Sequence, residues 1–159
     1  MVEIFHVAHV ALAGVWLGGL VFTTAVVSPA LKAMKWPEAE RVDVRSAIGR
    51  QYARVASVNL VLLALFAVLD GAFGGFGLDL FLEYALIILL FGLAGAHGAY
   101  FGRRLAGLAR AEREAGSEEE GRTLAERRRS LQRISLRVSY LNLLVSTAVL
   151  ILAIGAHPG

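Results

Sequence analysis

The chain has 159 residues, of which 57% are hydrophobic and 18% charged, and its mean hydropathy is +0.62. A soluble domain is only about half apolar, so this composition excludes a disordered chain and favours a membrane protein. Because the chain has no Cys, a disulfide scaffold, thiol catalysis and a Cys-ligated metal site are also excluded. The length predicts one domain, residues 1–159.

Four apolar segments predict four membrane-spanning helices, at residues 4–28, 53–70, 80–102 and 136–156. The first segment has about 25 residues, enough to cross about 30 Å of hydrocarbon at about 1.5 Å per residue. It follows Glu3 rather than a basic stretch, so we expect a retained helix and not a signal peptide. The predicted fold class is therefore all-α: a polytopic membrane protein with a four-transmembrane-helix up-and-down bundle and cytoplasmic helical extensions.

The basic residues predict the orientation of the chain in the membrane. All 16 Lys and Arg lie either between Lys32 and Arg54 or between Arg103 and Arg137. By the positive-inside rule, both basic loops, 29–52 and 103–135, are expected in the cytoplasm and both termini outside. We therefore predict a multi-pass protein of the cell (inner) membrane that contacts the lipid bilayer. Although the pI is 9.7, this clustering of charge argues against binding of nucleic acid.

The second basic loop predicts two helical extensions, broken near Gly116 and Gly121. Ser117 and Glu120 have the spacing of a capping box at the start of the second extension. The basic run 127–129 either contacts anionic lipid headgroups, at about 1 kcal/mol per residue, or serves only as a positive-inside retention signal.

Glycine spacing predicts close helix packing. Gly14 and Gly18 form one GxxxG pattern, and Gly98 and Gly102 form another. Such pairs let helix backbones approach closely, either within one chain or in a homo-oligomer. The glycine-rich run 71–77 predicts a flexible outer loop.

The histidines near the outer end are the candidate cofactor ligands. His6 and His9 are three residues apart, hence on one face of the first helix. His157 lies at the end of the fourth helix, and Glu83 near the outer start of the third. Imidazoles suit copper, zinc or haem iron, and a carboxylate completes a metal site or orients a ligand. The alternative is that His6 and His157 simply contact water among the headgroups.

A second polar layer is predicted in the inner half of the bundle. Its members are Thr23, Asn59, His97 and Asn142, each about five to seven residues from the cytoplasmic end of its segment. The layer is interpreted either as interhelical hydrogen bonding, worth about 0.6 to 2 kcal/mol per bond, or as a ligand or proton site.

The stretch FHVAHVALAGVWLGGLVF, residues 5–22, resembles the first helix of the CopD-like four-helix membrane family, which comprises the copper-resistance D domain and related families of unknown function. The shared positions are His9, Trp16, Gly18 and Gly19. Residues 48–71 resemble the second helix of that family. This resemblance implies a role in metal handling, with a copper ion bound at His9.

The first helix is also similar to that of the HemJ type of protoporphyrinogen oxidase, with a His seven residues before a Trp. That resemblance implies haem b held by His9. The sequence therefore leads to a membrane protein that binds a metal ion or haem through His9 and His6, with His157 and Glu83 assisting. The alternatives are a HemJ-type enzyme and a non-catalytic scaffold or small-molecule transporter.

Overall fold

The structure is a computed structural model, and it describes residues 2–36, 38–75 and 77–155. These residues are almost entirely helical and contain no strand. Four helical stretches are long and apolar enough to cross a membrane: Val2–Ala33, Val44–Gly74, Leu78–Arg113 and Glu118–Gly155. The predicted all-α fold of four membrane helices is confirmed, and the chain is a multi-pass membrane protein.

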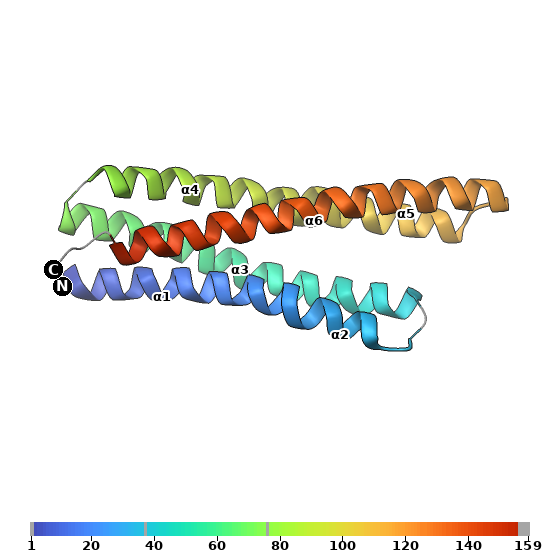
Figure 1. Ribbon diagram of the computed structural model, residues 1–159, viewed down its shortest axis with the longest axis horizontal. Helices are drawn as coiled ribbons and strands as arrows, with labels where there is room; N and C mark the ends of the chain where they lie inside the picture. The colour runs from blue at the N-terminus through green and yellow to red at the C-terminus, as the bar shows by residue number, and fades with distance from the viewer. Residues whose placement is uncertain (1, 37, 76, 156–159) are drawn as a thin grey trace. The chain divides into compact units, whose positions relative to one another are not determined.

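The chain divides into two compact units, Met1–Phe91 with Leu143–Gly159, and Gly92–Asn142. The first unit contains α1 (Val2–Val21), the π-helical turn η1 (Phe22–Val27), α2 (Ser28–Ala33), α3 (Glu38–Gly74), most of α4 (Leu78–Gly95) and the last part of α6 (Glu118–Gly155). Within it, α1 and α3 pack side by side (Figure 1).

The first helix continues past Pro29, where the sequence predicted its end. A proline has no amide hydrogen, and its ring clashes with the carbonyl four residues earlier. The chain accommodates this through the wider turn η1, in which Ser28 N–H donates to the carbonyl of Thr23, five residues back. The helix then runs on as α2 to Ala33.

The third helix is longer than predicted at both ends. Residues 38–52 belong to the predicted loop 29–52, but they are the start of α3. At the other end, α3 includes Gly71 and Gly74 of the glycine-rich run 71–77. It ends at Gly74, and the next residue, Gly75, has φ +100° and donates its amide to the carbonyl of Gly71 at 3.0 Å. Only glycine adopts this backbone conformation without strain, so the turn lies at Gly75.

The first unit is apolar both inside and outside. Its core is formed by small and aliphatic side chains and one Trp: Ala13, Trp16, Leu60, Leu63, Ala67, Ile87, Leu90 and Val149. Its exposed side chains are equally apolar, including Ile4, Val7, Val58, Val61, Ile88, Leu144 and Ile151. Such an outer surface is stable when the surrounding solvent is lipid, so these helices contact the bilayer.

Close helix packing in this unit occurs at Gly19. A Cβ atom there would lie 3.0 Å from Tyr52 Oη, so the missing side chain lets α3 approach α1. Cβ atoms added at Gly14, Gly18 or Gly98 would meet nothing within 4 Å. The GxxxG pattern of α1 therefore does not mark its contact with α3.

Two hydrogen bonds fix α1 in the middle of the first unit. Trp16 Nε1 donates to Ser146 Oγ of α6 at 2.9 Å, and both side chains are buried. Asn59 Nδ2 of α3 donates to the carbonyl of Leu12 at 3.1 Å. Because water is absent from the bilayer core, these groups have few other partners available.

The Trp16–Ser146 bond is expected to contribute about 0.6 to 1.7 kcal/mol, the range found for such bonds between membrane helices. The measurement is a double-mutant cycle with Trp16→Phe and Ser146→Ala, in which the free energy of unfolding is determined in bicelles. A coupling energy of zero would show that the two side chains contribute independently.

The second unit contains the end of α4, the π-helical turn η2 (Ala96–Gly102), α5 (Arg103–Arg113) and α6 up to Asn142. The predicted helical break near Gly116 is confirmed, but the break at Gly121 is wrong, since Gly121 lies inside α6. Ser117 Oγ accepts from the amide of Glu120 at 3.2 Å, as the capping box predicts. The side chain of Glu120 instead accepts from the amide of Gly116.

The basic run 127–129 takes part in this unit's own packing. Arg128 Nε donates to Glu112 Oε2 at 2.7 Å, which joins α6 to α5. Arg127 and Arg129 are exposed. Arg128 therefore has a structural role, and its two neighbours keep their side chains at the surface.

Candidate functional site

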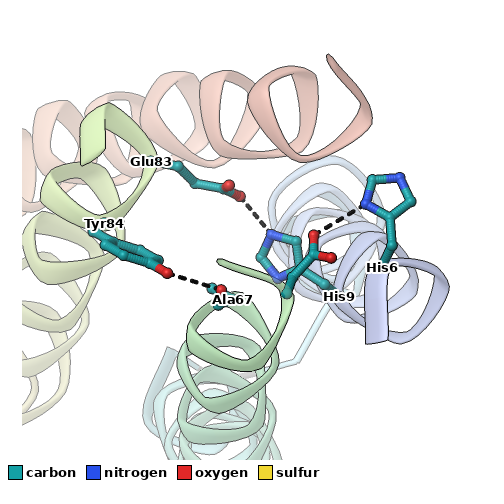
Figure 2. Close-up of polar contacts among 6 residues, drawn as sticks. His6, His9, Ala67, Glu83 and Tyr84 are labelled. Atoms are coloured by element: carbon teal, nitrogen blue, oxygen red, sulfur yellow. Dashed lines mark hydrogen bonds and ion pairs between the residues drawn. The ribbon is translucent and has the colours of Figure 1, made fainter. Parts of the chain in front are cut away.

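The most deeply buried polar contact of the first unit joins His9 of α1 to Glu83 of α4. His9 Nε2 lies 2.6 Å from Glu83 Oε1, and both side chains are 0% exposed (Figure 2). A contact this short is typical of a charge-assisted hydrogen bond. An isolated ionised group would be costly among apolar helices, so each member makes burial of the other tolerable.

A second histidine–carboxylate pair joins α1 to α3. His6 Nδ1 lies 3.1 Å from Asp70 Oδ2, with Asp70 1% and His6 20% exposed. In the sequence, Asp70 is the last residue of the predicted segment 53–70. Because α3 continues to Gly74, Asp70 lies inside the helix and faces the bundle. An acidic residue so near an apolar run was the signal that could have identified it.

A tyrosine joins the two carboxylate-bearing helices at the level of these pairs. Tyr84 Oη donates to the carbonyl of Ala67 at 3.0 Å (Figure 2). Tyr84 directly follows Glu83 on α4, and Ala67 is one turn before Asp70 on α3. The bond therefore fixes the backbone from which both carboxylates extend.

The His9–Glu83 pair leaves one buried atom of each side chain without a partner. Among the described residues, neither His9 Nδ1 nor Glu83 Oε2 makes a hydrogen bond. The contact between His9 Nε2 and Glu83 Oε1 has room for one proton, which is bonded either to the imidazole nitrogen or to the carboxyl oxygen.

The predicted metal ligands are not assembled as one set. His6 and His9 are held by different carboxylates, Asp70 and Glu83, while His157 lies outside the described residues. In residues 2–36, 38–75 and 77–155, no three His, Cys, Asp or Glu side chains gather in a way that could hold a metal ion. The site that the structure shows is two histidine–carboxylate pairs.

Two members of the predicted inner polar layer, Thr23 and Asn59, donate hydrogen bonds to backbone carbonyls of helices. Thr23 Oγ1 donates to two backbone carbonyls one turn earlier in its own helix, at 2.9 and 3.0 Å. Asn59 bonds to the backbone of Leu12. His97 and Asn142 belong to the second unit. A network joining all four side chains stays a prediction.

Comparison with known proteins gives a family without an assigned function. A domain of unknown function (DUF4149) matches residues 11–114, which include Asp70 and Glu83 and begin just after His9. No curated protein and no solved structure matches the chain. The CopD-like and HemJ-like resemblances therefore stay predictions. Since the match spans more than half of the sequence, the chain belongs to the DUF4149 family.

Proposed function

We propose that the protein carries protons within the membrane through its buried histidine–carboxylate pairs. It would lie in the cell (inner) membrane with both termini outside and the basic loops 29–52 and 103–135 in the cytoplasm. The distribution of Lys and Arg supports this orientation. The observation that carries the proposal is the contact of 2.6 Å between His9 and Glu83, two completely buried groups that both take up protons.

Stability alone is a poor reason for such a pair. Apolar residues of similar volume in place of a buried ion pair often leave a protein equally or more stable. Ionisable residues inside membrane helices are instead typical of proton relays and ion pathways. A bundle that holds two such pairs therefore fits a protein that binds protons better than a purely structural one.

The pair also has the chemistry that proton transfer needs. With one shared proton added to the imidazole, His9 and Glu83 form a neutral imidazolium–carboxylate pair. Loss of that proton leaves the pair with one net negative charge. Each proton bound or released thus changes the charge of the bundle interior by one unit. This change of charge would couple protonation to helix packing or to movement of another charge.

The test is proton flux into vesicles that contain the purified protein and a pH-sensitive dye, driven by a potassium diffusion potential. We expect Glu83→Gln and His9→Phe to lower the flux by roughly tenfold or more, as loss of a proton-transfer group does. Asp79→Asn, at an exposed acidic residue of the same helix, is the matched control and should retain it. Equal flux in all four proteins, or none above that of empty vesicles, would refute the proposal.

A metal ion or haem b at His9 is the second candidate, favoured by one observation. Glu83 binds Nε2 of His9 and leaves Nδ1 without a partner, and metal-ligating imidazoles are typically held in this way by a carboxylate. The CopD-like and HemJ-like resemblances point in the same direction, to a copper ion or haem. Metal analysis and a visible spectrum of the purified protein would test it. A bound metal or Soret band that His9→Ala removes would support this candidate, and a colourless, metal-free protein would oppose it.

Two partners are proposed beyond the bilayer itself. The exposed Arg127 and Arg129 have the charge to contact anionic lipid headgroups. The open space beside Gly14 and Gly18 is compatible with close approach of a second copy in a homo-oligomer.

A further inference from the structure

The two histidine–carboxylate pairs differ in their access to the surroundings. The side chains of His9 and Glu83 are 0% exposed and that of Asp70 is 1% exposed, while His6 is 20% exposed. Of the four side chains, His6 alone reaches the surface of the described structure. A proton held by the inner pair therefore needs a route past atoms that cover it.

The position of His6 on α1 suits such a route. His6 and His9 lie on one face of the helix, with Cβ atoms about 5–6 Å apart, a gap that one water molecule spans. At about 1.5 Å per residue, His6 is also about 4.5 Å nearer the N-terminal end of α1. The outer histidine is thus one short step from the buried pair.

Asp70 prepares His6 for this role. Its carboxylate accepts from His6 Nδ1 at 3.1 Å, which fixes the orientation of the ring. Among the described residues, the other ionisable groups near this end of the unit are Glu3 of α1, Asp79 of α4 and Tyr84 of α4, and the two acids are exposed. The part of α6 in this unit, Leu143–Gly155, has no charged residue.

We infer that His6, held by Asp70, is the residue through which protons enter and leave the His9–Glu83 pair. A hydronium ion gives one proton to neutral His6 and is left as water. The resulting imidazolium passes one proton to the deprotonated His9–Glu83 pair and returns to the neutral form. Release follows the same steps in reverse, so no proton is gained or lost overall. The inference rests on the proposed proton-carrying function and names the entrance to that site.

The experiment measures exchange of the His9 Nε2 proton with water, by NMR of the full-length protein in lipid nanodiscs with ¹⁵N-labelled histidine. His6→Phe and His6→Gln should each slow the exchange by roughly tenfold or more, because neither side chain accepts a proton. His6→Gln keeps a hydrogen-bond donor toward Asp70, which guards against loss of folding. Glu3→Gln, at an exposed residue of the same helix, should leave the rate unchanged.

The chemical shift of the His9 Nε2 proton should stay the same in the variants, showing that the inner pair is intact. If the signal exchanges too fast to be seen in the unmodified protein, its appearance in both His6 variants is the same expected result. Exchange as fast in both variants as in the unmodified protein would overturn the inference. Vesicles without proton flux would refute the proposed function instead, and the two failures are therefore distinguishable.

Discussion

Replacement of Glu83 by Ala is expected to lower the free energy of unfolding by about 3–5 kcal/mol, the usual effect of removing one partner of a buried charged pair. His9 would keep its place in the bundle but lose the acceptor that lies 2.6 Å away. Its Nδ1 atom already has no partner among the described residues, so the whole imidazole would be buried without a hydrogen bond. Steric trapping in bicelles measures this free energy.

Two further variants separate loss of the pair from loss of a carboxylate. Asp79→Ala removes an exposed acidic residue from the same helix and should change stability little. Replacement of both His9 and Glu83 by Leu should recover most of the loss, because no unpaired polar group would remain. If the double variant is as unstable as Glu83→Ala, the explanation through the unpaired imidazole is wrong.

Replacement of Gly19 by Leu is expected to destabilise the protein by about 1–3 kcal/mol, the usual cost of overpacking. A Cβ atom at this position would already lie 3.0 Å from Tyr52 Oη and 3.1 Å from Cε2 of the same ring. Gly19→Ala should cost less than Gly19→Leu, because a small shift of the phenol ring relieves the contact of a single methyl group. Thermal unfolding in detergent, followed by circular dichroism, ranks the variants.

Gly18→Leu is the matched control, since a Cβ atom there meets nothing within 4 Å. It should leave unfolding unchanged, although it would reduce self-association if a second copy packs against this face. Equal loss of stability in the Gly18 and Gly19 variants would mean that the contact with Tyr52 does not determine the packing of α1.

The number and approximate position of the membrane helices were predictable because both follow from hydropathy over long stretches. The helix ends were less predictable. Pro29 and Gly71 are typical helix terminators, yet a π-helical turn accommodates the first and the second lies inside α3. In a membrane, continued helix satisfies backbone groups that a loop would expose, and this outweighs the local preferences of single residues.

The candidate site was predictable in part. His6, His9 and Glu83 could be selected from the sequence because polar residues in apolar segments are costly and rare. The pairing of His6 with Asp70 and of His9 with Glu83 could not be predicted, because it depends on how each helix is rotated about its axis. Asp70 was missed as a partner for a related reason: its burial follows from the unexpected length of α3.

The first helix is bonded to three later helices of its unit: α3 through His6 and Leu12, α4 through His9, and α6 through Trp16. Yet α1 precedes all three in the chain, so a ribosome completes it first. The side chains of His6, His9 and Trp16 therefore enter the lipid or its boundary before their partners exist. More than a hundred further residues are synthesised before Ser146, the partner of Trp16. The polar contacts of α1 are therefore complete only after α6, the last helix, has been inserted.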